Sequence, residues 1–229
     1  MKRLNNEQKR KKANLIKIEG LRLLENSLKQ DWFPELITTE KHLKNLKFKN
    51  LKKIFISEEK IIKKYMNLPK LEPIIAIGEY PVKKNVDYNE NIVAFFSQDP
   101  TNIGSIIRTS LAHGINNFLF SKNSPDPYNL LVLRTSAGFS FGIKNSKINI
   151  DESPKLSNHK LIVASAHDGI KIENLKSKNK KFCLVFGHES KGVPKPWEEK
   201  GEKITIPIKN IESLSVSAAA AIIINKITK

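Results

Sequence analysis

The second half of the chain alternates short apolar runs with longer segments of helical periodicity. Runs of four or five apolar residues predict buried strands, whereas apolar positions three or four residues apart predict helices. The predicted strands are 92–96, 117–120, 161–165, 182–186 and 203–206, and the predicted helices are 102–113, 130–137 and 214–228. Continuous apolar strands separated by helices are typical of a parallel sheet covered on both faces, so we expect an α/β fold.

The first third of the chain has a less regular pattern. Helical spacing after Gly20 is given by Ile18, Leu21, Leu24, Glu25 and Leu28. The other elements predicted there are a helix over 58–66 with Ser57 as N-cap, and strands over 54–56 and 74–77. Residues 81–90 lack periodicity and are rich in turn formers, which favours a boundary. We therefore expect a small α/β domain over 1–84 and a parallel-sheet domain over 85–229.

The charge of the chain points to a polyanionic partner. The 229 residues include 40 Lys and Arg against 23 Asp and Glu, a net charge of +17. Residues 1–84 hold 21 of these bases against 10 acids, with basic segments at 9–12, 41–53 and 63–64. Such an excess favours nucleic acid as the partner and the first domain as its main contact. The alternative is a Lys-rich surface without a binding role.

Composition excludes several other classes of protein. Cys183 is the single cysteine, which excludes a disulfide framework and a cysteine-based zinc site. The five histidines (42, 113, 159, 167 and 188) show no metal-ligand spacing, so we expect no metal, and only His188 lies in a candidate ligand loop. No signal peptide is visible. The longest apolar run, 218–224, is far shorter than the roughly 20 residues of a membrane span, so we expect a cytoplasmic protein without membrane contact.

Ligands of parallel α/β sheets bind at the loops that follow the strands, which directs attention to three segments. After the first strand, Asp99 and Pro100 form a turn, and Asn102 can begin a helix. Arg108 is expected near the same face of that helix as Asn102, and its planar guanidinium suits a phosphate. A surface arginine in an ion pair is the alternative interpretation of Arg108.

The other two segments follow residues 186 and 206. Gly187 and Gly192 frame a short polar loop, for which an ordinary turn is the alternative. Neither a Walker sequence nor GxGxxG occurs, which argues against ATP and NAD. No GxSxG sequence indicates a serine hydrolase either. Ser213 is the expected N-cap of the last helix, and Ser215 lies at the same helix start.

Together these segments resemble the SpoU/TrmH family of RNA ribose 2′-O-methyltransferases in the SPOUT superfamily. The segments that carry the resemblance are 99–104 with Arg108, 134–138, 186–192, and 206–208 with 213–219. The likeness is close over 92–229. More loosely, 18–20 and 73–77 resemble the N-terminal substrate-binding domain of many members, which is similar to a small ribosomal-protein fold.

The resemblance implies a C-terminal trefoil knot, a homodimer with its site near the interface, and S-adenosylmethionine as cofactor. The catalytic residues implied are Asn102, Arg108, Glu189, Ser213 and Ser215, and the cofactor-binding residues implied are Phe186, Gly187, Gly192, Ile206, Ile208, Leu214 and Ser215. Ser215 departs from the family, which usually has Asn at this place. Serine keeps a donor and an acceptor, but its reach is shorter.

The expected reaction is methylation of a ribose 2′-hydroxyl in RNA. Arg108 would grip the adjacent phosphate and stabilise the forming alkoxide, Asn102 would position the ribose, and Glu189 would orient Arg108 or its loop. Ribosomal RNA is preferred over tRNA, by analogy with the ribosomal members. The alternatives are a tRNA methyltransferase and, because of Ser215, a catalytically silent RNA-binding relative. An unrelated enzyme using a nucleotide is disfavoured by the missing glycine motifs.

Overall fold

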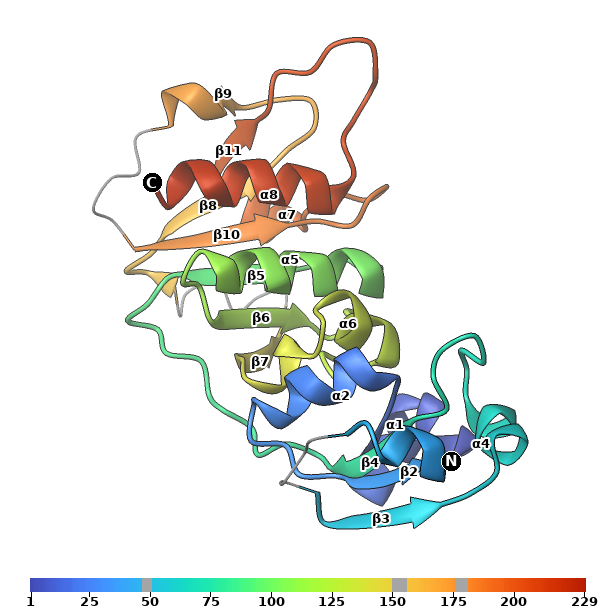
Figure 1. The fold of residues 1–229 in the computed structure, drawn as a ribbon. Helices are drawn as coiled ribbons and strands as arrows, with labels where there is room; N and C mark the ends of the chain where they lie inside the picture. Colours follow the sequence, from blue (N-terminus) through green and yellow to red (C-terminus); the bar gives the residue numbers. More distant parts are fainter. Residues whose placement is uncertain (47–50, 150–155, 176–180) are drawn as a thin grey trace. The chain divides into compact units, whose positions relative to one another are not determined.

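The computed structural model describes residues 1–46, 51–149, 156–175 and 181–229 (Figure 1). The chain divides into two compact units: the first contains 1–82 and 126–142, and the second contains 83–125 and 143–229. The division after Val82 falls two residues before the expected boundary. Segment 126–142, however, packs with the first unit, whereas the sequence analysis places it in the second domain. Lys47 and Lys49 of the expected basic segment lie outside the described residues.

The second unit is built on a seven-stranded sheet in the order β7-β6-β5-β10-β8-β11-β9. Every pairing in it is parallel, which confirms the predicted parallel α/β fold. Its strands are β5 (Ile92–Phe95), β6 (Asn117–Ser121), β7 (Lys144–Ile148), β8 (Lys160–Ala164), β9 (Ile170–Lys171), β10 (Phe182–Phe186) and β11 (Glu202–Thr205). Its helices are α5 (Pro100–Ala112), α7 (Lys195–Glu198), α8 (Val216–Ile227) and the short η4 (Ile172–Asn174).

The central strands of this sheet are covered on both faces. Every residue of β5 and β10 is buried, as their unbroken apolar sequences predict. On one face Trp197 of α7 lies in a cluster with Ala94, Val163 and Val185. Helices α5 and α8 pack side by side (Figure 1). Within the described ranges no helix combines the length and the apolar character needed to cross a membrane.

Two helix starts in the second unit differ from the expected ones. Helix α8 begins at Val216, and its N-cap is Ser215, whose Oγ accepts from the Ala218 amide at 3.2 Å. The prediction of Ser213 as N-cap is therefore wrong, because the chain before Ser215 is still loop. Helix α5 begins at Pro100, two residues early, because Asp99 accepts from the amides of the next turn. The knot stays a prediction.

The first unit is built on a four-stranded sheet in the order β1-β4-β2-β3. Strands β1/β4 and β4/β2 pair antiparallel, and β2/β3 pair parallel. Its strands are β1 (Leu15–Glu19), β2 (Glu35–Thr38), β3 (Lys53–Ile56) and β4 (Ile75–Glu79). Its helices are η1 (Lys2–Asn5), α1 (Glu7–Ala13), α2 (Leu21–Leu28), α3 (Glu40–Leu43), α4 (Glu59–Tyr65), α6 (Leu130–Thr135) and η2 (Phe139–Phe141).

Two expectations for this unit are wrong. Ile18 belongs to β1 and not to a helix, because Gly20 with φ +91° turns the chain between β1 and α2. The helical spacing is real only from Leu21 onward. Ser57 does not cap α4, since the N-cap is Glu58 and no side chain caps this helix.

Segment 126–142 completes the core of the first unit. Tyr128, Leu133 and Phe141 lie in one apolar cluster with residues of β1, α2 and β4, and the Phe141 ring stacks on Trp32 at 4.6 Å. Buried Arg10 and Asp126 form an ion pair at 3.3 Å. The hydroxyl of Tyr80 donates to the same carboxylate. Burial and the Asp126 charge both raise the pKa of Tyr80, so the phenol stays protonated.

A second buried ion pair lies in β1. Lys17 Nζ and Glu19 Oε1 are 2.8 Å apart, and both side chains are almost completely inaccessible. The Glu19 carboxylate also accepts the backbone amides of Asn67 at 2.9 Å and Leu68 at 3.1 Å. Lys17 donates to the carbonyl of Tyr65 at 3.1 Å. The pair therefore anchors the end of α4 and the turn after it to the sheet.

Candidate functional site

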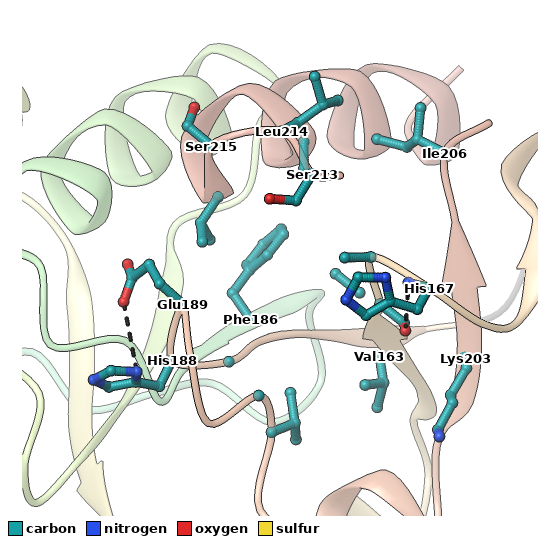
Figure 2. A pocket seen from close by; sticks show the side chains of 18 of the residues that line it. Val163, His167, Phe186, His188, Glu189, Lys203, Ile206, Ser213, Leu214 and Ser215 are labelled. Atoms are coloured by element: carbon teal, nitrogen blue, oxygen red, sulfur yellow. Dashed lines mark hydrogen bonds and ion pairs between the residues drawn. The ribbon is translucent and has the colours of Figure 1, made fainter. Parts of the chain in front are cut away.

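A cavity of about 640 Å³ lies in the second unit at the carboxyl ends of β8, β10 and β11 (Figure 2). These strands are neighbours in the sheet, so the loops that follow them meet along one edge. The loops concerned are 165–168, 187–193 and 206–215, and the first turns of α8 also line the cavity. We call it the main cavity.

The walls of the main cavity are partly apolar and partly polar. Figure 2 shows the ring of Phe186 between Glu189 on one side and His167 on the other, with the serines at the start of α8 above it. Its charged lining consists of three carboxylates and two ammonium groups: Asp168, Glu189, Glu198, Lys191 and Lys203. The lining is therefore mixed, with a small excess of negative charge.

The loop after β10 is closed on itself by backbone hydrogen bonds. The His188 amide donates to the Gly192 carbonyl at 2.9 Å, and the Gly192 amide donates back at 2.8 Å. A Cβ at Gly187 would lie 2.3 Å from the carbonyl carbon of Gly192, so no side chain fits there. Gly192 itself has φ +67°. The two glycines are thus required for a tight, rigid loop.

Glu189 joins this loop to the segment after β5. Its Oε1 accepts from Asn102 Nδ2 at 2.9 Å and from the Ser97 hydroxyl at 3.0 Å. Ser97 is completely buried and also accepts the Asp99 amide at 3.2 Å. Because the Nδ2 group of Asn102 is bound by Glu189, the amide orientation is fixed and its Oδ1 is presented as an acceptor.

His188 has a defined tautomer in this loop. Its Nδ1 accepts the Ser190 amide at 3.1 Å, so the proton of the neutral ring is on Nε2. The Glu189 Oε2 atom is 3.9 Å from the same Nδ1.

Most of the site residues expected from the sequence meet in the main cavity. Those that line it are Asn102, Phe186, Gly187, Glu189, Gly192, Ile206, Ile208, Ser213, Leu214 and Ser215. The structure thus brings three segments, separated by up to 113 positions in the chain, to one place.

Arg108 is the exception, since it does not line the main cavity. It is exposed on α5, and within the described ranges its side chain forms no hydrogen bond or ion pair. Six residues of α-helix correspond to about 1.7 turns, so Arg108 and Asn102 face different directions, contrary to expectation. The hydrogen bonds of Glu189 go to Asn102 and Ser97, which means that Glu189 orients the loop and not Arg108.

The loop after β8 was not among the segments predicted from the sequence. Asp168 forms an ion pair with Lys203 of β11 at 2.8 Å, and Lys203 also pairs with Glu198 at 2.7 Å. The hydrogen bonds with Lys203 and Ser165 lower the pKa of Asp168, and those with Asp168 and Glu198 raise the pKa of Lys203. The rule that selected the other three loops also applies after the predicted strand 161–165, and would have found Asp168.

The chain is similar to known RNA methyltransferases in sequence and fold. The model of the SpoU rRNA Methylase family matches residues 90–225. The 23S rRNA (guanosine(2553)-2′-O)-methyltransferase RlmP of Bacillus subtilis is 26% identical over 231 residues, which cover 97% of this chain and 92% of that protein. An uncharacterized tRNA/rRNA methyltransferase of Borreliella burgdorferi is 33% identical over 137 residues, covering 58% of this chain and 60% of that protein.

Two solved structures show the same fold. The AdoMet-bound rRNA methyltransferase from Sinorhizobium meliloti has a TM-score of 0.81 and 21% identity, covering 99% of this chain and 91% of that one. The SpoU methyltransferase AviRb from Streptomyces viridochromogenes has a TM-score of 0.80 and 18% identity, covering 99% and 95%. The family match spans more than half of the chain and includes most of the loops around the main cavity. The protein belongs to the SpoU rRNA methylase family.

Proposed function

We propose that the protein transfers a methyl group from S-adenosylmethionine to a ribose 2′-hydroxyl of ribosomal RNA. The observation that carries this proposal is the main cavity, where the closed loop after β10 is hydrogen-bonded to Asn102 through Glu189. The substrate class follows the relatives of this chain, of which RlmP methylates 23S rRNA according to its name. The net charge of +17 supports an RNA partner.

The residues of the main cavity fit S-adenosylmethionine. A volume of about 640 Å³ is within the range of small-molecule sites, and the walls combine apolar side chains with backbone groups of a rigid loop. The cofactor carries a sulfonium and an ammonium against one carboxylate, which matches the excess of carboxylates in the lining. Phe186, Ile206 and Leu214 would hold its apolar parts. When bound, the cofactor supplies an electrophilic methyl group.

Asn102 and Ser213 are the side chains best placed to hold the target ribose. The Oδ1 atom of Asn102 can accept a hydrogen bond from the 2′-hydroxyl, because Glu189 fixes the other end of the amide. Ser213 is exposed at the cavity, and Figure 2 shows it above Phe186. Ser215 has a structural task as the N-cap of α8, so Ser213 is the freer donor of the two.

Arg108 is proposed to grip the phosphate beside the target ribose and to stabilise the developing alkoxide. Its exposed position on α5 is compatible with a contact to RNA.

The homodimer implied by the resemblance stays a prediction, as does the subunit whose cavity Arg108 would serve. Light scattering on the purified protein measures the oligomeric state.

The decisive experiment is a map of 2′-O-methylated positions in total RNA from cells with and without this protein. We expect one or a few ribosomal positions to lose methylation, and purified protein with S-adenosylmethionine to restore them on rRNA from the deficient cells. Loss of methylation only in tRNA would replace rRNA by tRNA as substrate. An unchanged map, together with calorimetry showing no S-adenosylmethionine binding, would contradict the proposal.

A further inference from the structure

A second cavity of about 740 Å³ lies at the same edge of the sheet in the second unit. It is lined by residues that end or follow β5, β6 and β7: Phe96, Gln98, Ser121, Lys122, Asn123, Ile148 and Asn149. His188, Lys191 and Gly192 of the loop after β10 line both this cavity and the main cavity. The closed loop is therefore a common wall, and ligands in the two cavities would lie on neighbouring sites.

The two cavities differ in charge. Among the described residues, those that line the second cavity include Lys122 and Lys191 but no Asp or Glu, whereas three carboxylates line the main cavity. Three side-chain amides, those of Gln98, Asn123 and Asn149, also line it. Phe96 and Ile148 are only 7% and 4% exposed and provide an apolar surface. The second cavity thus offers cations, amide donors and acceptors, and an apolar floor.

The turn that carries Lys122 and Asn123 is rigidly held. Lys147 Nζ donates to the carbonyls of Ser121 at 3.3 Å and Ser124 at 2.6 Å. The Ser124 hydroxyl donates to the Phe95 carbonyl at 3.0 Å and lies 2.8 Å from the Ser121 hydroxyl. A turn fixed in this way presents its two exposed side chains with little entropic cost on binding.

We propose that the second cavity binds a nucleotide of the RNA substrate next to the methylated ribose. Lys122 and Lys191 suit a backbone phosphate, while the amides and the apolar floor suit an unpaired base. The wall shared with the main cavity places this nucleotide beside the methyl donor. This inference rests on the proposed function and extends it, because it assigns a nucleotide-binding role to the second cavity.

The test uses the full-length protein and rRNA from cells that lack it. Lys122→Gln should weaken rRNA binding roughly three- to tenfold and flatten its salt dependence by roughly 0.7–0.9 in log–log slope, the value for one lost phosphate contact. Lys122→Glu should weaken rRNA binding more, and Lys122→Arg, which keeps the charge, should bind rRNA as the wild type does. The KM for rRNA should rise while the dissociation constant of S-adenosylmethionine, measured by calorimetry, stays unchanged.

The matched control is Lys226→Gln, which removes the same charge from α8 of the same unit outside both cavities. Asn123→Glu is an independent variant that places a carboxylate in the second cavity, and it should reduce rRNA affinity as Lys122→Glu does. The side chains of Lys122 and Asn123 are exposed, so variants at these two positions should fold.

The results separate this inference from the proposed function. The Lys122 variants and Asn123→Glu could bind rRNA with the same affinity, and the same salt dependence of that affinity, as Lys226→Gln. In that case the second cavity is not a nucleotide site, whether or not the protein methylates rRNA. If the Lys122 series weakens rRNA binding as expected but no methylation of rRNA occurs, the nucleotide site stands and the proposed reaction fails.

Discussion

The first unit contains two buried ion pairs, whereas the second unit arranges charged groups around a cavity. Lys17 and Glu19 are about 1% and 0% exposed, and the Arg10–Asp126 pair is similarly covered. In the second unit Lys203 and Asp168 are 31% and 59% exposed and line the main cavity. Buried pairs cost stability when one partner is lost. Pairs at a cavity remain accessible to a ligand, so the same chemistry stabilises the fold in one unit and is exposed to a ligand in the other.

The largest expected effect concerns the buried pair of the first unit. Glu19→Ala leaves the buried Lys17 ammonium without its counter-charge and two backbone amides without an acceptor, and should lower the free energy of unfolding by about 3–5 kcal/mol. Chemical denaturation measures this. Glu40→Ala removes a carboxylate from an exposed pair in the same unit and should barely move the transition. Equal effects would remove the contrast between buried and exposed pairs.

Two arginines, one from each unit, sharpen the comparison. Arg108→Ala should fold and bind S-adenosylmethionine normally but lose roughly 10²–10³ in turnover, the range for a lost oxyanion donor. Arg10→Ala should instead lower stability, because the buried Asp126 carboxylate loses its ion-pair partner, and should leave turnover per folded molecule intact. Wild-type turnover in Arg108→Ala would show that this residue has no catalytic role.

A smaller effect is expected at the link between two loops of the main cavity. Glu189→Ala removes the acceptor that fixes Asn102 and should reduce turnover about tenfold, the value of one hydrogen bond to a charged group. Glu189→Gln keeps an acceptor oxygen and should recover part of the rate. Single-turnover kinetics measure both variants. A role in binding alone would raise KM without changing the single-turnover rate at saturation.

The basic helix of the first unit should contribute a still smaller, salt-dependent effect. Lys9 and Lys12 are exposed on α1. If they contact RNA phosphates, Lys9→Gln with Lys12→Gln should flatten the salt dependence of rRNA affinity by roughly 0.7–0.9 per lysine. Filter binding at several salt concentrations gives the slope. An unchanged slope would assign the RNA surface to other residues.

The smallest expected effect is the pH dependence at Asp168. Lys203 lowers the pKa of Asp168 in the folded protein, so its contribution to stability is present above the ordinary aspartate pKa of about 3.9 and is lost as pH falls through the lower folded value. Lys203→Met removes the main cause and should bring the pKa of Asp168 back toward its ordinary value. NMR titration of the carboxyl group measures the change, and an identical titration in both proteins would contradict it.

The sequence predicted those parts of the fold whose apolar pattern is unambiguous. The five strands of the second unit with apolar runs were found, whereas β7 was missed because its sequence, Lys-Asn-Ser-Lys-Ile, is polar and only Ile148 is buried. Ile18 was misassigned because Ile18, Leu21 and Leu24 have helical spacing although Gly20 interrupts the chain. Local spacing does not reveal such a break unless the glycine conformation is known.

The site was predictable as far as loops could be assigned to strand ends. Ten expected residues line the main cavity, because each follows a strand or begins a helix at the same edge. The ion pairs of Lys203 could not be predicted, since they depend on β8 and β11 being neighbours, and strand order is not contained in local sequence. The different directions of Asn102 and Arg108, by contrast, follow from their six-residue spacing on one helix and could have been predicted.

The first unit is made of two separate chain segments, and this determines when it can fold. Its core takes Tyr128, Leu133 and Phe141 from segment 126–142, which is synthesised after β5 and β6 of the second unit. A nascent chain that has reached residue 82 therefore still lacks part of this core. Domains usually fold in order of synthesis as they leave the ribosome. Here the amino-terminal unit has to wait for residue 142, so co-translational folding of the two units is interleaved.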